Sequence, residues 1–249
     1  MLYQYGVTSI LGLALVMFIA LFFITAPYGR HRRPTWGPNL NPRLGWVLME
    51  LPSVVWFAWV YFHGAWAFHK VPLTLFCLWE LHYAQRTFVY PTLLRSSSGN
   101  MPISIVAMGG VFNVINATLN ALALTHLRSG YSHSWFTDPR FLLGTTVFFV
   151  GFAINLHSDH ILRNLRTPRE VGYKIPYGGL FRWVTSPNYL GEIVEWFGWM
   201  LASWSLAGAS FALFTFTNLA HRAWAHHKWY YANFPEYPKN RKALLPRIF

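Results

Sequence analysis

Long apolar runs separated by short polar segments dominate the hydrophobic pattern of this chain. A helix of about 20 apolar residues crosses the roughly 30 Å hydrocarbon core of a bilayer. The pattern predicts five single spans, at 8–26, 44–62, 71–94, 102–125 and 141–156. A longer run at 190–219 is interrupted at 205–208, which predicts a hairpin of two more spans. We therefore expect an all-α integral membrane protein with seven transmembrane helices.

The basic residues indicate which side of the membrane each loop faces. Seven spans place sixteen of the twenty Lys and Arg residues on one side, including the tail from 222 to 247. Six spans would put that basic tail opposite the basic segment 163–182. Because cytosolic loops carry the excess of Lys and Arg, we expect the N-terminus outside and the C-terminus in the cytosol. The run at 8–26 lacks a basic n-region and a small-residue cleavage site, so we interpret it as a permanent span.

Composition narrows the class of protein further. Hydrophobic residues make up 54% of the 249 positions, charged residues make up 11%, and the net charge is +12. The positive charge flanks the spans without forming a separate basic domain, which argues against nucleic acid as a partner and fits a lipid bilayer with anionic headgroups. We expect a single membrane domain over 1–249. The one cysteine, Cys77, allows no internal disulfide, and no obligate protein partner is evident.

Polar residues between the fifth span and the hairpin fall on helical faces. Side chains spaced by three or four residues share one side of a helix. One face is Asn155, Asp159, Arg163 and Arg166, and the other is Asn188, Glu192 and Glu195. Ionisable groups at the edge of a membrane are costly unless something satisfies them. The two faces therefore predict a polar ligand held between helices.

Two further signals point to an anionic ligand at the cytosolic side. Ser186-Pro187 is typical of a helix start, which would aim free backbone N–H groups at that side. Basic residues lie nearby in the sequence, at Arg163, Arg166, Lys174 and Arg182. A third polar face, with residues spaced by four, closes the last span at Asn218, Arg222, His226 and Tyr230. A nucleotide is a reasonable ligand for such a site.

Glu50 is an acidic residue inside a predicted span, just before Pro52. An intramembrane carboxyl is interpreted as an acid or hydrogen-bond donor in a cavity, the structural alternative being a hydrogen bond between helices. The stripe of Asn113, Asn116 and Asn120 on the fourth span is interpreted as interhelical hydrogen bonding.

The third span carries polar residues at i, i+3 and i+7, namely Tyr83, Arg86 and Tyr90. A tyrosine at this depth usually packs only against neighbours. An arginine there requires a partner, and Glu50 or Glu80 could supply it.

Motifs of several other site classes are missing from the sequence. It has no G-x-G-x-x-G after a strand, no P-loop and no nucleophile elbow. The pairs His157/His160 and His226/His227 lack companion Cys or acidic residues at zinc or di-iron spacing, so we expect no metal site. The residues alone indicate a polytopic protein with a cytosol-facing anion site and an intramembrane carboxyl.

Several long motifs nevertheless resemble one family. In chain order, the second half contains INLHSDHILRNLR, then YKIPYGGLFRWVTSPNYLGEIVEWFGWMLASWSL, then HHKWYYANFPEYPKNRKALLPRIF. These runs resemble the C-terminal domain of the steroid 5α-reductases. Upstream, MELPS and HYAQRTFVYPTLL resemble the second and third spans of that family. The resemblance is closest to the branch that acts on 3-oxo-Δ4-steroids.

The resemblance implies a seven-helix membrane reductase that uses NADPH and reduces the Δ4 double bond by hydride transfer to C5. It implies mainly substrate-side helices in 1–140 and a cofactor-binding region in 141–249. Glu50 and Tyr83 would bind the 3-keto oxygen of the steroid substrate, and Trp46 would border the steroid slot. The implied cofactor contacts are Asn155, Asp159, Arg166, Tyr173, Lys174, Asn188, Glu192, His226 and Tyr230.

These residue types suit that chemistry. Negative charge develops on the carbonyl oxygen when an enone is reduced, and a Tyr hydroxyl and a protonated Glu can donate hydrogen bonds to it. Burial in an apolar cavity favours the neutral carboxyl, which is the form able to donate.

The sequence departs from the family pattern at three places. Met49 stands where the family frequently has Gln. Lys174 replaces an Arg, which removes bidentate phosphate binding. The polar loop 95–100 has a different sequence from that of the family. Two alternatives stay open. One is a related membrane enzyme, such as a sterol double-bond reductase or an isoprenylcysteine-type methyltransferase; the other is a non-enzymatic sterol-binding or transport protein. The expected location is the ER membrane in a eukaryote or the cytoplasmic membrane in a bacterium.

Overall fold

The computed structural model describes residues 2–23, 37–94, 101–127, 130–166, 170 and 172–249. The described residues form seven helical rods, two of which contain an internal π-helical turn. The predicted loop 95–100 and the end of the run 8–26 lie outside the described residues. The helices are α1 (Leu2–Phe23), α2 (Pro42–Leu51), α3 (Phe57–Phe62), α4 (Lys70–Ala84), α5 (Tyr90–Leu93), α6 (Ile103–Thr125), α7 (Pro139–Asn164), α8 (Pro187–Ser203) and α9 (Leu206–Asn233).

The expectation of a helical protein with membrane-crossing segments is confirmed. Among the described residues, four helical stretches are long and apolar enough to cross a membrane: Tyr3–Leu21, Pro42–Phe62, Ile103–Thr125 and Pro139–Asn164. The predicted hairpin breaks at Trp204, whose φ of 45° is left-handed, and Ser205 caps α9 through a hydrogen bond to the Gly208 N–H. The fifth predicted span is longer than expected, because α7 continues to Asn164.

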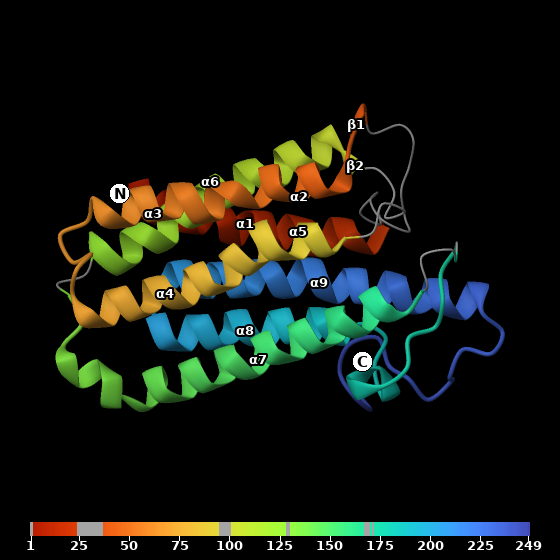
Figure 1. The fold of residues 1–249 in the computed structure, drawn as a ribbon. Helices are drawn as coiled ribbons and strands as arrows, with labels where there is room; N and C mark the ends of the chain where they lie inside the picture. The colour runs from red at the N-terminus through yellow and green to blue at the C-terminus, as the bar shows by residue number, and fades with distance from the viewer. Residues whose placement is uncertain (1, 24–36, 95–100, 128–129, 167–169, 171) are drawn as a thin grey trace.

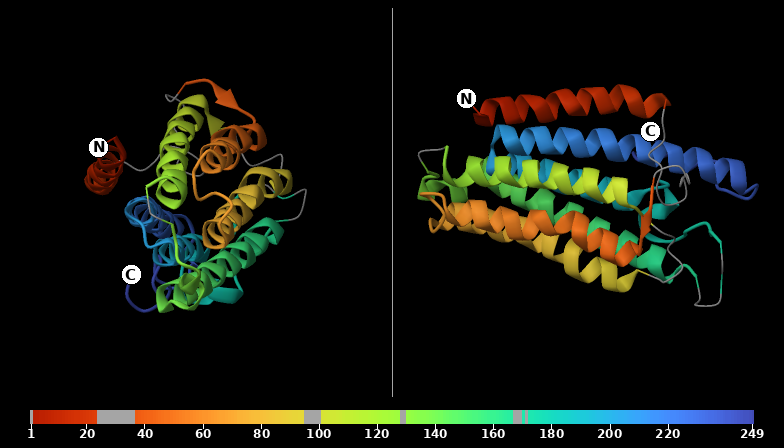
Figure 2. Two further views of the ribbon diagram at one scale, coloured as in Figure 1. Left: turned by 90° about the vertical axis from the view of Figure 1, so that its left-hand side faces the viewer. Right: turned by 90° about the horizontal axis from the view of Figure 1, so that it is seen from above.

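Successive rods run in alternating directions along one bundle (Figure 1). The N-terminus therefore lies at one end of the bundle and the C-terminal end of α9 at the other. Helix α1 lies at the outer edge and packs against α9 (Figure 2). A two-stranded antiparallel pair, β1 (Asn39–Leu40) with β2 (Met101–Pro102), links the entries to α2 and α6. Short 3₁₀ turns at His133–Thr137 and Gly179–Arg182 precede α7 and α8.

Helices α7 and α8 approach each other through four glycines at seven-residue spacing, Gly144 and Gly151 on α7 and Gly191 and Gly198 on α8. A Cβ added at Gly151 would lie 2.2 Å from the backbone nitrogen of Glu195, and one at Gly198 would lie 2.3 Å from that of Phe148. Since real Cβ atoms do not come this close to backbone atoms, only glycine fits. Small residues at such positions let membrane helices pack backbone to backbone.

Two π-helical turns interrupt the rods that contain Glu50 and Tyr83. Pro52–Trp56 joins α2 to α3, and Gln85–Val89 joins α4 to α5. A π turn leaves backbone carbonyls without their usual helical donors, and neighbouring helices can satisfy them. The indole N–H of Trp79 donates to the Ser53 carbonyl at 2.7 Å. The two rods are therefore joined beside Glu50 and Tyr83.

The asparagine stripe on α6 makes the interhelical hydrogen bonds that its spacing predicts. Asn120 Oδ1 accepts from the Trp199 indole N–H on α8 at 2.9 Å. Asn113 Nδ2 donates to the Met49 carbonyl on α2 at 2.8 Å. The same amide nitrogen also contacts Glu50, so this stripe both ties helices together and holds a candidate site residue.

The glycine contact between α7 and α8 is testable by substitution. We expect Gly151→Ala to lower the free energy of unfolding by about 1–3 kcal/mol, because the new methyl group would overpack against the backbone of α8. Gly110→Ala on α6 is the matched control, since nothing lies within 4 Å of a Cβ there. Alanine is the better helix former by about 1 kcal/mol, so the control should be neutral or stabilising. Melting curves in detergent compare the two, and equal melting temperatures would contradict the close approach.

Candidate functional site

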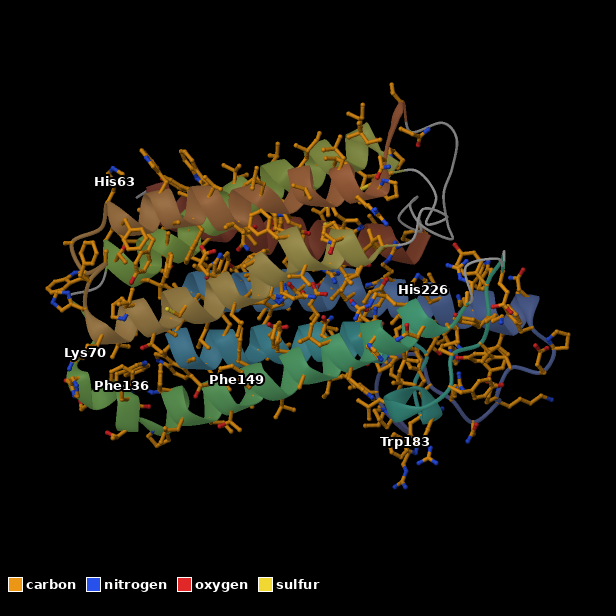
Figure 3. The ribbon with its side chains drawn as sticks, in the orientation of Figure 1. His63, Lys70, Phe136, Phe149, Trp183 and His226 are labelled. Atoms are coloured by element: carbon orange, nitrogen blue, oxygen red, sulfur yellow. The ribbon has the colours of Figure 1, made fainter. Side chains whose placement is uncertain are left out.

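A cavity of about 230 Å³ opens at the end of the bundle where α7, α8 and α9 meet α5. His226, on its wall, lies at the end opposite His63, Lys70 and Phe136 (Figure 3). Five of the predicted cofactor residues line it: Asp159, Arg166, Asn188, His226 and Tyr230. Residues of three helical faces from separate parts of the chain thus line one space. Tyr90, from α5, also lines the cavity, so the first half of the chain contributes to it as well.

The start of α8 forms one wall of the cavity. Helix α8 begins at Pro187, as the sequence predicts, with Ser186 at the cap position. The Ser186 side chain makes no capping hydrogen bond, and its Oγ is buried with no hydrogen-bond partner among the described residues. Arg163 Nη1 is in the same situation. Buried polar atoms are almost always paired, so these two point to a polar ligand that satisfies them.

The amide and carboxyl groups of the first two predicted faces contact one another. Asn155 Nδ2 donates to the Asn188 carbonyl at 3.0 Å, and Asn188 Nδ2 donates to Asp159 Oδ1 at 3.3 Å. Asn155 is buried behind the cavity wall and orients Asn188 from there. The structure brings the two faces together, with Asn155 as a supporting residue outside the cavity lining.

Arg86 connects these faces to the rest of the bundle. Its Nη1 lies 3.4 Å from Asp159 Oδ2 and its Nη2 lies 3.6 Å from Glu192 Oε2. The guanidinium also lies 4.8 Å from the ring centroid of Trp46 and 4.4 Å from that of Tyr90. From the sequence, Glu50 or Glu80 is the expected partner of Arg86. Asp159 on α7 and Glu192 on α8 are instead the carboxylates within ion-pair distance of the guanidinium. Among the described residues, neither Glu50 on α2 nor Glu80 on α4 forms an ion pair with it.

The loop before α8 packs on the outer side of the cavity. Arg166 Nη1 donates to the Gly172 carbonyl at 2.7 Å, and the Tyr230 hydroxyl donates to the Lys174 carbonyl at 3.2 Å. The side chains of Tyr173 and Lys174 are not brought into the cavity. Tyr173 packs edge-on against Trp229 at 4.9 Å, and Lys174 pairs with Glu170 at 2.6 Å.

The residues expected to bind substrate lie deeper in the bundle. Glu50 is buried, and its Oε2 accepts a 3.0 Å hydrogen bond from Asn113. Tyr83 is buried among aromatic rings, 4.8 Å from Trp79 and 5.5 Å from Trp196. Trp46, one turn before Glu50, contacts both Arg86 and Tyr90. Trp46 and Arg86 therefore stand between the Glu50 region and the cavity.

The pair of His82 and Glu195 was not identified from the sequence. His82 Nδ1 lies 2.8 Å from Glu195 Oε1, and both side chains are buried. His82 precedes Tyr83 in the chain and its ring packs edge-on against it at 4.9 Å. The sequence signal that could have identified this pair is His82 itself, which is another ionisable residue inside a predicted span. Within the described part of the chain, no group of three or more His, Cys, Asp or Glu residues could hold a metal ion.

Comparison with known proteins bears on this arrangement. A family model described as 3-oxo-5-alpha-steroid 4-dehydrogenase matches residues 99–249. The chain is 45% identical over 224 residues to 3-oxo-5-alpha-steroid 4-dehydrogenase 1 of Homo sapiens, covering 89% of this chain and 86% of that protein. The chain belongs to this family. The macaque counterpart, from Macaca fascicularis, is 46% identical over 89% of the chain and 84% of its own length.

The similarity to this family extends to plants. Steroid 5-alpha-reductase DET2 of Arabidopsis thaliana is 41% identical over 239 residues, which are 93% of this chain and 90% of that protein. The resemblance seen in the sequence motifs is thus confirmed over nearly the full chain. Because this alignment covers 93% of the chain, it extends over the region of Glu50 and Tyr83, upstream of the family-model match.

The role of Arg86 can be tested through stability. Arg86→Leu would leave the buried Asp159 and the half-buried Glu192 without a positive charge beside them, and we expect a loss of about 3–5 kcal/mol. Adding Glu192→Gln should recover part of that loss, because one unpaired charge is then removed. Arg140→Leu is the control, since Arg140 pairs with Asp138 at a more exposed site and exposed pairs contribute little. A melting temperature for Arg86→Leu no lower than that of Arg140→Leu would show that Arg86 does not hold the two carboxylates.

Proposed function

We propose that this protein is a membrane-embedded, NADPH-dependent reductase of the Δ4 double bond of 3-oxo-Δ4-steroids, giving 5α-reduced 3-oxo-steroids. The observation that carries the proposal is the cavity on three helical faces of a chain that belongs to the 3-oxo-5-alpha-steroid 4-dehydrogenase family. Relatives named steroid 5-alpha-reductase support the same reaction.

The cavity suits a phosphate-containing cofactor. Arg163 and Arg166 contribute positive charge to its wall, and Asn188 and His226 contribute polar groups. Guanidinium groups bind phosphate oxygens in a fork, which makes them strong phosphate ligands. The unpaired Arg163 Nη1 and Ser186 Oγ are donors that a phosphate would satisfy. Asn155, Asn188 and Tyr230 would then orient the nucleotide.

The size of the cavity limits what it holds. At about 230 Å³ it is smaller than the roughly 300–1,000 Å³ typical of ligand sites, so it takes one part of a dinucleotide. The contacts of Arg166 with Gly172 and of Tyr230 with Lys174 border it on the outside. We infer that these contacts part when the whole cofactor binds, which brings Tyr173 and Lys174 to it. Glu192 and Asp159 would mark its inner end, beside Arg86.

The steroid would lie on the inner side of Arg86, near Glu50 and Tyr83. Since Asn113 donates to Glu50 Oε2, Oε1 is the oxygen that would carry the proton and donate it in a hydrogen bond. That proton and the Tyr83 hydroxyl would both point to the 3-keto oxygen. Trp46 would border the steroid.

The reaction requires the protein to stabilise charge on the substrate. When bound, NADPH supplies the hydride that adds to C5. The electron pair of the C4–C5 double bond then moves toward C3, and the 3-keto oxygen becomes negative until C4 takes a proton. Glu50 and Tyr83 would stabilise that oxygen through hydrogen bonds that strengthen as the charge develops. The buried aromatic surroundings of Tyr83 would keep competing water out.

The proposal includes a seven-span topology, with the N-terminus outside and the cavity facing the cytosol. The alternating rods (Figure 1) and the basic residues around the cavity support it. The membrane would be that of the ER in a eukaryote or the cytoplasmic membrane in a bacterium.

One set of assays tests both the reaction and the stabilisation of negative charge on the 3-keto oxygen. Purified protein incubated with NADPH and a 3-oxo-Δ4-steroid should yield the 5α-reduced ketone. We expect Glu50→Gln and Tyr83→Phe each to lower kcat on the order of a hundredfold or more. The double variant should lose less than the product of the two, because both groups act on one oxygen. Product formation by Glu50→Leu at the unaltered rate would refute the role of Glu50.

The cofactor assignment predicts a separate kinetic effect. Arg166→Ala and Asn188→Ala should raise the KM for NADPH more than the KM for steroid. The arginine should have the larger effect, because it can contact phosphate as a fork. Lys70→Ala removes a charge at the opposite end of the bundle (Figure 3) and should leave both constants unchanged. Lower melting temperatures in both cavity variants with an unaltered KM for NADPH would mean that these residues only stabilise the fold.

A further inference from the structure

A second cavity, of about 800 Å³, lies between α9 and the C-terminal segment. Its α9 residues are Trp224, His227, Lys228 and Tyr231. At 100° per residue, the centre of this set lies about 130° around α9 from His226 and Tyr230, which line the first cavity. The second cavity is therefore separate from the proposed cofactor site, and nothing in the proposed reaction uses it.

The wall of this second cavity is strongly basic. Its charged residues are Lys228, Lys239, Arg241 and Lys242, and no acidic residue lines it. Lysines 228, 239 and 242 are exposed. Four like charges around one space repel one another unless an anion offsets them.

The buried guanidinium of Arg241 is the strongest evidence for an anionic ligand in this cavity. Its side chain is only 3% exposed, yet none of the eight acidic residues of the chain pairs with it. Its Nε and Nη1 atoms are buried without an acceptor among the described residues. The neutral contacts of the guanidinium are a hydrogen bond with the Tyr237 side chain and the ring faces of Tyr177 and Tyr237, whose centroids lie 4.8 and 5.3 Å away. A buried cation without a counter-charge is costly, so an anion in the adjoining cavity would stabilise it.

Hydrogen bonds hold the backbone around this cavity in place. The Thr185 N–H donates to the Lys242 carbonyl at 2.8 Å, and the Lys242 N–H donates to the Trp183 carbonyl at 2.9 Å. The Tyr231 hydroxyl donates to the Lys239 carbonyl at 2.9 Å. The backbone that carries the basic side chains is therefore fixed to α9 and to the entry of α8.

The apolar residues at the rim of the cavity favour a phospholipid over a soluble phosphate ligand. Trp224 stacks on Phe249 at 5.6 Å, and Ile248 beside them is 78% exposed. The apolar half of α9 ends near Ala220, so at 1.5 Å per residue the cavity begins about 6 Å beyond it. That is the depth of the headgroups of a bilayer, where Trp and basic side chains collect.

We propose that this second cavity binds the headgroup of an anionic phospholipid. The phosphate would lie against Arg241, Lys239 and Lys242, with Lys228 at the edge over the Trp224 ring, 4.9 Å away. An acyl chain would leave the cavity along Trp224, Ile248 and Phe249 toward the apolar part of α9.

The test uses the full chain in a mild detergent and follows its melting temperature as lipid is added. Phosphatidylglycerol should raise the melting temperature at saturation, and phosphatidylcholine should not. In the variant Lys228→Gln/Lys239→Gln/Lys242→Gln, we expect the half-saturating concentration of phosphatidylglycerol to rise about fivefold per lysine, on the order of a hundredfold in all. Arg241→Met should raise the melting temperature without lipid, because it removes the uncompensated buried charge, and should abolish the response to phosphatidylglycerol.

The matched control removes the same charge elsewhere. Lys70→Gln/Arg182→Gln/Arg247→Gln changes three basic residues outside the cavity and should respond to phosphatidylglycerol as the unaltered protein does. Equal weakening in the two triple variants would overturn the proposal in favour of general surface charge. A full response to inorganic phosphate alone would overturn it in favour of a soluble phosphate ligand. Because the readout is stability without NADPH or steroid, the result is independent of the proposed reaction.

Discussion

The close contact between α7 and α8 is the constraint on which the candidate site depends. Gly144 and Gly151 face Gly198 and Gly191 so closely that backbone atoms of one helix occupy the place of a side chain on the other. This approach sets the distance between the polar faces that follow. Asn155 reaches the Asn188 carbonyl and Asn188 reaches Asp159 only because no side chain separates the two helices. A wider helix pair would leave these groups unpaired at the edge of the bilayer, at a cost of about 1–3 kcal/mol each.

Arg86 connects the polar faces of α7 and α8 to the rest of the bundle. Its distances of 3.4 and 3.6 Å to Asp159 and Glu192 are longer than the roughly 2.7–2.9 Å of a tight charge-assisted hydrogen bond. The guanidinium is thus shared between two carboxylates and is also held by the rings of Trp46 and Tyr90. A shared cation of this kind can move toward one carboxylate when a ligand engages the other. In the proposed reaction, this is how occupancy of the cavity would affect the side where the steroid lies.

Part of this arrangement was predictable because it is local. The faces Asn155–Asp159 and Asn188–Glu192 follow from helical spacing alone, and so does the interhelical role of the asparagines on α6. The partner of Arg86 could not be predicted in the same way, since it depends on which helices become neighbours. The seven-residue glycine spacing predicts the contact between α7 and α8, because small residues at a fixed spacing mark helix contacts. It does not predict that Arg86 lies beside these two helices. Tyr173 and Lys174 came from the family resemblance and lie in a loop without periodicity, so no spacing could place their side chains.

Helix α9 separates two spaces of different character. On one side His226 and Tyr230 border a cavity whose wall combines arginines with Asp159; on the other, Lys228 and Arg241 border one with no acid at all. The two are joined by a hydrogen bond between Thr185, which lines the first, and His227 Nδ1, which lines the second, at 2.6 Å. Tyr237 adds a 2.8 Å contact to the same Thr185 hydroxyl, and burial raises the pKa of its phenol, which keeps it neutral. A mixed wall can bind a ligand with both donors and acceptors, as a nucleotide has, whereas a wholly basic wall favours a simple anion. In the two proposals, the segregation of acidic residues to one side of α9 would therefore give one helix two binding faces that do not compete for the same ligand.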